Sequence, residues 1–250
     1  MEYRFCENRN WEDFASGRVL YGGGGIPNFP VRLVNEMYRR ALSFSDRKNG
    51  ITLYDCCCGG GYALTVLGLL NQDSIRHIMA SDIDEKMLEA ARRNLSLLSL
   101  SGMEQRLKEL AALHEAYGKE SHAQAMESAL RLQELLEGEM DCCVFRADVT
   151  GTLPVGRTPD IILTDIPYGD LVDWKQDGTG QETEGTGRTE KQDGLLLDRM
   201  FESLRGISDE HTVFAVSMDK KQKPDTAGLK ILERVNVGKR RFLVGKFLYG

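Results

Sequence analysis

The sequence predicts an α/β domain built on a mostly parallel, seven-stranded sheet. Short apolar segments that suit buried strands alternate with segments whose apolar residues recur at helical spacing. The last two strand candidates, Lys230–Val235 and Arg241–Phe247, flank a Val237-Gly238 turn and predict a C-terminal antiparallel hairpin. Strand–helix alternation that ends in a hairpin is typical of an open α/β sheet with one antiparallel strand.

Each predicted strand is short, apolar and bounded by turn-forming residues. In chain order the strands are expected at 51–53, 75–80, 142–146, 160–163, 212–217, 230–235 and 241–247. Helical spacing of apolar residues predicts helices at 33–42, 62–70, 85–95 and 195–204. Pro30 suits the first position of the first helix, and Asp84 suits the N-cap of the third.

Two segments do not fit the simple alternation. Residues 104–139 carry apolar residues at helical spacing, but a strand–helix–strand unit does not need them, so we expect a helical insertion that Gly118 breaks into two helices. Residues 175–194 contain no large apolar side chain, which predicts a mobile loop. The whole chain, 1–250, is otherwise expected to form a single domain.

The composition is that of a soluble globular protein, with 41% apolar and 28% charged residues among 250. The chain has no apolar stretch of about 18 residues and no apolar signal region at its N-terminus, so a cytoplasmic protein is expected. Cys56, Cys57 and Cys58 are contiguous, as are Cys142 and Cys143, and this spacing fits neither a disulfide framework nor a metal site. We expect reduced thiols, with Cys142 and Cys143 buried in a strand.

Charge is unevenly distributed along a chain whose net charge is −6. Residues 211–250 contain nine basic and three acidic residues, a net charge of +6. Residues 104–140 carry −4, and residues 165–198 carry −6. Such segregation suits an RNA-facing basic edge beside acidic outer segments, although each cluster alone is also compatible with an ordinary solvated face.

A glycine-rich turn follows the first predicted strand. The spacing Asp55-x-Cys57-x-Gly59-x-Gly61 resembles the first motif of S-adenosylmethionine (SAM) methyltransferases, D/E-x-G-x-G-x-G, with Cys57 in place of the first glycine. Such a turn brings backbone N–H groups and a helix N-terminus close to a ligand. By itself the turn also fits a dinucleotide-binding dehydrogenase, or a tight turn with no ligand.

Further acidic residues follow the next strands. Asp82, which precedes Ile83, lies 23 residues after Gly59, a distance that suits an acid bound to ribose hydroxyls. Asp84 could take that role, but its position favours a helix cap. Asp148 follows the third strand, where an acid in the SAM fold can accept a hydrogen bond from the adenine amino group; a turn aspartate is the other interpretation.

The segment Asp165-Ile166-Pro167-Tyr168, at the end of the fourth strand, resembles the D/N-P-P-Y motif of methyltransferases that modify planar nitrogens. An amine conjugated to a ring is a poor nucleophile, because its lone pair is delocalised. Asp165 and a backbone carbonyl near Pro167 could bind the amine and orient its lone pair, while Tyr168 stacks on the planar base that carries the amine. Ile166 replaces the first proline, which disfavours DNA-amino and glutamine methyltransferases. Cytosine C5 chemistry would need a cysteine where Tyr168 stands. A plain strand-end turn is the non-catalytic alternative.

Most of the chain resembles the avilamycin-resistance rRNA methyltransferases of the AviRa type. The resemblance extends over Asn28–Leu33, Cys57–Leu70, Ala80–Asp84, Tyr117–Lys119, Leu163–Gly169 and Trp174. It implies a SAM-methyltransferase (Rossmann-like) fold with seven strands and a helical insertion. It also implies SAM as cofactor, a guanine nitrogen of large-subunit (23S) rRNA as methyl acceptor, and a role in avilamycin resistance.

On this interpretation the partner is ribosomal RNA or the large ribosomal subunit, and the protein acts as a monomer. Trp174 would stack on the base, and the candidate phosphate contacts are Lys220, Lys221, Lys223, Arg240 and Arg241. Three alternatives remain open. They are methyl transfer to another planar amine in tRNA, DNA or protein glutamine, a non-catalytic SAM-binding RNA module, and an NAD dehydrogenase.

Overall fold

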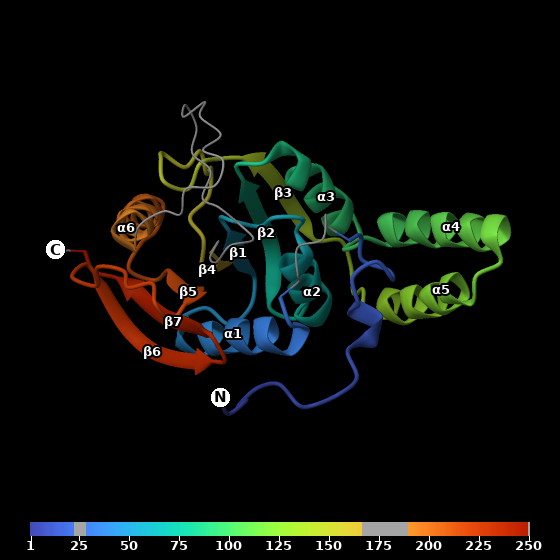
Figure 1. Cartoon of the computed structure of the whole chain (residues 1–250), viewed down its shortest axis with the longest axis horizontal. Helices are drawn as coiled ribbons and strands as arrows, with labels where there is room; N and C mark the ends of the chain where they lie inside the picture. Colours follow the sequence, from blue (N-terminus) through green and yellow to red (C-terminus); the bar gives the residue numbers. More distant parts are fainter. Residues whose placement is uncertain (23–28, 167–189, 250) are drawn as a thin grey trace.

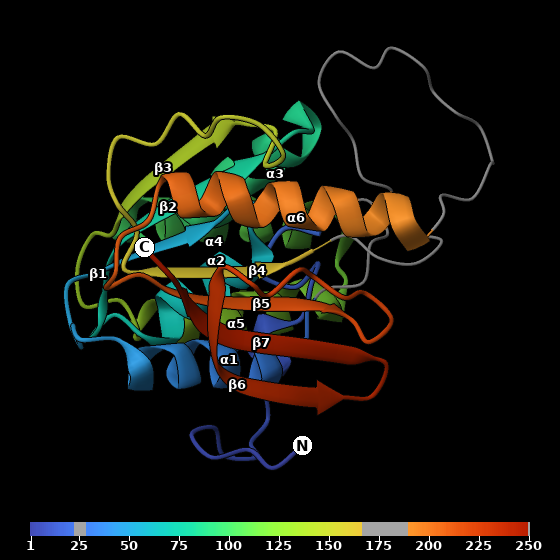
Figure 2. The ribbon, with the colours of Figure 1, turned by 90° about the vertical axis from the view of Figure 1, so that its left-hand side faces the viewer.

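The computed structural model describes residues 1–22, 29–166 and 190–249, which form one seven-stranded sheet with the strand order β3-β2-β1-β4-β5-β7-β6 (Figures 1 and 2). The strands are β1 (Ile51–Asp55), β2 (Ile75–Asp82), β3 (Asp141–Arg146), β4 (Ile161–Asp165), β5 (Val213–Asp219), β6 (Leu229–Val237) and β7 (Arg240–Phe247). All five N-terminal strands are parallel, and β7 runs antiparallel to β5 and β6. The predicted sheet and its C-terminal hairpin are confirmed.

Helices cover both faces of this sheet (Figure 1). The helical elements are η1 (Glu12–Phe14), α1 (Val31–Phe44), α2 (Tyr62–Leu70), α3 (Glu85–Ser96), α4 (Leu100–Tyr117), α5 (Glu120–Gln133) and α6 (Glu190–Gly206). The core beneath α1, α2 and α3 contains Leu53 and Leu163, whereas the core beneath α6 contains their neighbours Tyr54 and Ile162. Successive strand residues therefore point to opposite faces, and both faces are buried, as a parallel sheet requires.

The segment that we expected to be an insertion forms a helical hairpin, α4 and α5, that projects beyond the sheet (Figure 1). Gly118 ends α4 in the left-handed conformation, with φ of 61°, and its N–H donates to the His114 carbonyl oxygen. Glycine adopts this conformation without steric cost, so the predicted break at Gly118 is confirmed. Of the described helices, none is long and apolar enough to cross a membrane.

Three expectations differ from the structure in detail. Pro30 precedes α1 as its N-cap and is not its first helical residue. Residues 190–194, which we expected within a mobile loop, begin α6, and the remainder, 175–189, lies outside the described residues. Cys143 is exposed and Cys142 only half-buried, because β3 is the edge strand of the sheet that the described residues form.

A buried carboxylate attaches the N-terminal segment to α1. Glu36 has no exposed surface, and its oxygens accept hydrogen bonds from the backbone N–H groups of Arg4, Phe5 and Cys6 at 2.8–3.0 Å. The Arg40 guanidinium also donates to Glu36, at 2.7 Å. Burial alone would raise the pKa of Glu36, but these donors hold it below the usual value.

Glu36→Ala should lower the free energy of unfolding at neutral pH by about 3 kcal/mol or more, because it leaves Arg40 and three backbone donors without their buried acceptor. Urea denaturation followed by circular dichroism measures this loss. The loss should shrink as the pH falls through the depressed folded pKa of Glu36, since the carboxylate stabilises the fold only while ionised. Glu12→Ala, which removes an exposed partner of Arg18, should change stability little. Equal effects of the two substitutions would contradict this account.

Candidate active site

The glycine-rich turn lies at the carboxyl end of β1 and leads directly into α2. Gly59 and Gly61 have positive φ values of 51° and 72°, which glycine adopts without strain. A Cβ atom on Gly61 would come within 3.0–3.1 Å of the Ala91 backbone and side chain in α3. The motif therefore requires glycine here for two reasons, namely the backbone conformation and the close packing of the turn against α3.

Asp82 joins this turn to the end of β2. Its two carboxylate oxygens accept hydrogen bonds from the Gly59 N–H at 2.9 Å and from the Asp84 N–H at 3.0 Å. Burial raises the pKa of Asp82 above the usual value, while these N–H donors act in the opposite direction. The carboxylate and the adjacent Ile83 are half-buried at the rim of the sheet.

Asp84 takes the role of a helix cap. Its side chain accepts a hydrogen bond from the Lys86 N–H at 3.0 Å, one residue inside the first turn of α3. This confirms the predicted N-cap. Asp82 therefore remains the better placed of the two acids for a ligand at the glycine-rich turn.

Asp55 joins the same turn to β4. Its Oδ1 accepts hydrogen bonds from the Thr164 hydroxyl at 2.7 Å and from the Cys57 N–H at 3.1 Å. Burial, together with the negative charges of Asp82 and Asp165, raises the pKa of Asp55 to about 7, against the effect of these two donors. Thus the ends of β1 and β4 are held together by side chains from both sequence motifs.

Asp165 ends β4 and faces an arginine from β7. Its Oδ2 lies 3.5 Å from the Arg240 guanidinium, which also stacks over the Phe29 ring at 4.7 Å. Burial raises the pKa of Asp165 to about 6, whereas the Ser217 hydroxyl and Arg240 favour its ionised form. Oδ1 is buried and has no hydrogen-bond partner among the residues that the structure describes. The predicted neighbours Pro167, Tyr168 and Trp174 lie outside those residues.

A cavity of about 140 Å³ brings the two motifs together. Asp55, Cys57 and Gly59 line it from the first motif, and Thr164 and Asp165 from the second. The remaining lining comes from the N-terminal segment, the glycine-rich turn, β4 and the helices, and it is mostly apolar: Tyr21, Phe29, Val34, Met37, Cys58, Gly60, Tyr62, Ala63, Met87, Asn94 and Leu163. An apolar cavity with a few convergent polar groups is typical of a small-ligand site. Gly61 and Asp82 support this lining from behind.

Sequence reasoning missed Tyr21 and Asn94. The buried Asn94 amide donates to the carbonyl oxygens of Tyr21 and Gly60, at 3.1 and 2.8 Å, and its oxygen accepts from the Tyr21 N–H at 2.8 Å. It thereby attaches the N-terminal segment to the glycine-rich turn. One signal was present in the sequence, because Asn94 interrupts the apolar face that Leu88, Ala91 and Leu95 form on α3.

Asp148 forms an Asx turn just after β3. Its Oδ1 accepts from the Thr150 N–H at 2.8 Å and from the Thr150 hydroxyl at 2.7 Å. Asp148 does not line the cavity described above. The structure therefore displays the turn that was the other interpretation of Asp148, and its contact with adenine remains a prediction.

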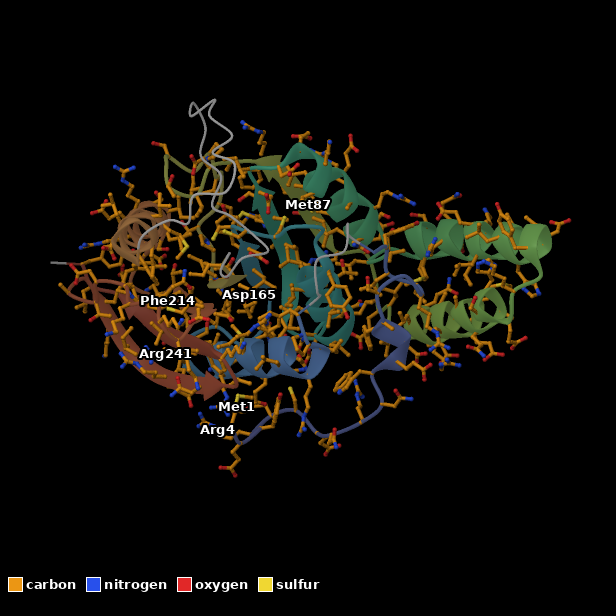
Figure 3. The ribbon with its side chains drawn as sticks, in the orientation of Figure 1. Met1, Arg4, Met87, Asp165, Phe214 and Arg241 are labelled. Atoms are coloured by element: carbon orange, nitrogen blue, oxygen red, sulfur yellow. The ribbon has the colours of Figure 1, made fainter. Side chains whose placement is uncertain are left out.

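The predicted phosphate contacts lie at the end of the sheet where Asp165 lies, because Asp165 pairs with Ser217 of β5 and Asp219 of β5 pairs with Arg240 (Asp165 and Arg241 are labelled in Figure 3). Lys220, Lys221 and Lys223 follow β5 and are exposed. Arg240 and Arg241 begin β7, where Arg240 pairs with Asp219 in the ladder. A hydrogen bond of 3.1 Å from the Lys220 N–H to the Lys239 carbonyl oxygen joins the two segments. We call Lys220, Lys221, Lys223, Lys239, Arg240 and Arg241 the basic rim.

No metal cluster accompanies these groups in the described part of the chain. Among those residues, no three His, Cys, Asp or Glu side chains are arranged to hold a metal ion. Burial and neighbouring thiol and carboxylate groups raise the pKa of Cys57 and Cys58 well above the usual value. Both thiols are therefore protonated at neutral pH and are poor nucleophiles.

Known proteins resemble this chain over nearly its whole length. A model of the family described as "rRNA methyltransferase AviRa" matches residues 1–240. The chain is 38% identical over 247 residues to a 23S rRNA (guanine(2535)-N(1))-methyltransferase of Streptomyces viridochromogenes, covering 95% of this chain and 93% of that protein.

Solved structures give the same assignment. The rRNA methyltransferase AviRa of S. viridochromogenes, at 1.5 Å, superposes with a TM-score of 0.83 at 36% identity, and the match covers 98% of this chain and 96% of that one. A SAM-dependent methyltransferase of Clostridium acetobutylicum shares the fold alone, with a TM-score of 0.51 at 10% identity over 88% and 93% of the two chains. The chain therefore belongs to the AviRa family of rRNA methyltransferases, whose cofactor is S-adenosylmethionine.

Proposed function

We propose that this protein methylates the N1 atom of a guanine in 23S rRNA. The observation that carries the proposal is Asp165, which presents a buried oxygen without a hydrogen-bond partner in the described residues and lines the same cavity as the glycine-rich turn. The 38% identical relative from Streptomyces viridochromogenes is a 23S rRNA (guanine(2535)-N(1))-methyltransferase, and this supports the guanine, its N1 atom and the 23S rRNA. The resemblance to the family adds avilamycin resistance as the expected consequence.

The residues of the cavity fit SAM. Gly59 and Gly60 leave space beside the backbone, and Tyr62, Met87 and Leu163 offer apolar surface. We propose that Asp55, Cys57, Gly59 and Gly61 hold the methionine part of SAM, Asp82 and Ile83 the ribose, and Asp148 the adenine. The buried carboxylate of Asp55 suits the α-amino group of SAM, because a cation there would favour its ionised form.

Guanine N1 carries a hydrogen and a delocalised lone pair, so it must lose its proton to become a good nucleophile. When bound, SAM supplies an electrophilic methyl carbon. The electron pair of N1 would form the new N–C bond to this carbon, and the sulfur of SAM would keep the electron pair of the C–S bond that breaks. Oδ1 of Asp165 would accept the N1 proton. Pro167 would keep the adjoining loop stiff, and Tyr168 and Trp174 would stack on the base.

The basic rim, apart from Arg240, would hold the RNA backbone beside the cavity. Its cations follow β5 and begin β7, at the end of the sheet where Asp165 lies, whereas the projecting hairpin carries an acidic surplus. Because RNA carries one negative charge per phosphate, this rim would orient it over Asp165. A cytoplasmic location accords with such a substrate. The monomeric state stays a prediction.

The methyl acceptor can be tested directly with radiolabelled SAM. Protein-free 23S rRNA, assembled large subunits, tRNA and duplex DNA are incubated separately with the purified protein. Label on rRNA or subunits, found as 1-methylguanosine after digestion, is the expected result. Label on tRNA or DNA alone would overturn the rRNA substrate. Product formed in excess of enzyme distinguishes catalysis from a SAM-binding module, which cannot turn over.

Asp165→Ala should reduce methyl transfer about 10²- to 10⁴-fold, the usual contribution of a proton acceptor. SAM affinity, measured by calorimetry, should stay within a few-fold, because we assign SAM to the glycine-rich turn and Asp82 and the base to Asp165. Asp165→Asn should be similarly inactive, since it keeps the shape and loses the basic oxygen. Normal activity in either variant would contradict the role of Asp165.

Asp82→Ala should weaken SAM binding about tenfold or more, because it removes a ribose acceptor and also frees the Gly59 N–H that fixes the turn. Asp84→Ala is the matched control, since its side chain caps α3 and should affect stability more than SAM affinity. Calorimetric titration with SAM measures both. If only Asp84→Ala weakened binding, the ribose role would move to Asp84.

Replacing Lys220, Lys221 and Lys223 together with Gln should lower RNA affinity and reduce the dependence of log affinity on log salt by about two units, as expected for lost phosphate contacts. Filter binding at several salt concentrations measures this slope. Replacing the exposed Lys108, Lys119 and Lys230 removes the same charge elsewhere and should leave the slope nearly unchanged. Equal effects of the two triple variants would indicate non-specific attraction only.

A further inference from the structure

Arg240 has its backbone in the sheet, and its guanidinium contacts two separate parts of the fold. Arg240 begins β7, where it pairs with Asp219 of β5 in the antiparallel ladder. Its guanidinium stacks over the Phe29 ring at 4.7 Å, and Phe29 itself lines the cavity. The same guanidinium lies 3.5 Å from Asp165. The Arg240 guanidinium therefore lies against Phe29 and Asp165 and differs from a side chain that extends into solvent to meet a phosphate.

The ion pair is asymmetric. Arg240 approaches Oδ2 of Asp165, whereas Oδ1 is buried and has no hydrogen-bond partner in the described ranges. A bidentate arginine would occupy both oxygens of a carboxylate. Here one oxygen faces the cation and the other stays available to accept a proton from a ligand in the cavity.

Apart from the Ser217 hydroxyl and Arg240, which both favour the ionised form of Asp165, the surroundings disfavour that form. Burial raises its pKa to about 6, and Asp55 on β1 adds a second carboxylate nearby. On β5 the neighbouring Ser217 contributes a hydroxyl, and α1 contributes the uncharged Val34 and Met37 to the cavity. Of the described residues that influence Asp165, Arg240 supplies the positive charge.

We propose that Arg240 is a positioning residue for methyl transfer, which keeps Asp165 ionised through Oδ2 and leaves Oδ1 aimed at the N1–H of guanine. This inference rests on the proposed function. In the proton transfer, the N1 hydrogen passes to Oδ1 and its electron pair stays on nitrogen for the new N–C bond. Asp165 returns the proton to water after the product leaves. Sequence reasoning placed Arg240 among the phosphate contacts, and the two roles predict different kinetics.

Arg240→Gln should shift the acidic limb of the pH profile of kcat to higher pH by about one unit. The reason is that the loss of an adjacent Arg raises the pKa of an Asp by about that amount. At about pH 6.5 kcat should fall about threefold, and it should approach the original value at higher pH. Arg240→Lys keeps the charge and should keep the limb near its original position. Saturating rRNA and SAM are used throughout.

Lys246→Gln is the matched control, because it removes one positive charge from the opposite end of β7, where Lys246 contacts Asp46. Its profile should be unchanged. A phosphate contact would instead raise the KM for rRNA in Arg240→Gln and leave the pH profile of kcat in place. That outcome, or an equal shift in Lys246→Gln, would overturn the proposal.

A measurement without substrate separates this inference from the proposed function. Carboxyl ¹³C NMR of Asp-labelled protein follows the titration of Asp165, whose signal the Asp165→Asn variant identifies. In the SAM-free protein, Arg240→Gln should raise the pKa of Asp165 and Lys246→Gln should not. An unchanged pKa in Arg240→Gln would refute the role of Arg240, even if the enzyme methylates rRNA. A raised pKa in a protein that methylates no RNA would refute the proposed function alone.

Discussion

The site depends on two side chains that attach the glycine-rich turn to its neighbouring strands. Asp82 at the end of β2 accepts the Gly59 N–H, and Asp55 at the end of β1 accepts the hydroxyl of Thr164 on β4. Because the parallel strands β1, β2 and β4 end at the same edge, these hydrogen bonds fix the turn relative to Asp165.

The same arrangement concentrates negative charge. Asp55, Asp82 and Asp165 surround one small region, and burial raises the pKa of each. A carboxyl whose pKa is raised on folding stabilises the fold below its unfolded pKa, and this stabilisation is lost as the pH rises through the folded pKa. For Asp55 and Asp165 the loss falls between about pH 4 and pH 7, so at neutral pH the site retains ionised carboxylates at the expense of stability. A cationic ligand and the Arg240 guanidinium both offset this cost.

The N-terminal segment contributes more than a covering for the core. Tyr21 reaches the cavity because Asn94 binds its backbone on both sides, while the guanidinium groups of Arg93 and Arg106 stack on its ring at 3.9 and 4.3 Å. Arg106 also donates to the Val19 carbonyl oxygen at 2.8 Å. The projecting hairpin therefore supports the site through Arg106, in addition to presenting its own surface to solvent.

The sequence alone determined the strand set, the C-terminal hairpin, the break at Gly118 and the cap at Asp84, because each follows from local periodicity or from backbone preferences. It also placed Asp55, Gly59, Asp82 and Asp165 at strand ends. Only the tertiary structure decided that Tyr21 and Asn94 complete the cavity, that Cys143 lies on an edge strand, and that Arg240 faces Asp165. These contacts join residues that are distant in the chain. Arg240 and Asp165, for example, lie on β7 and β4, with β5 between the two strands. Local sequence patterns carry no information on which distant side chains meet.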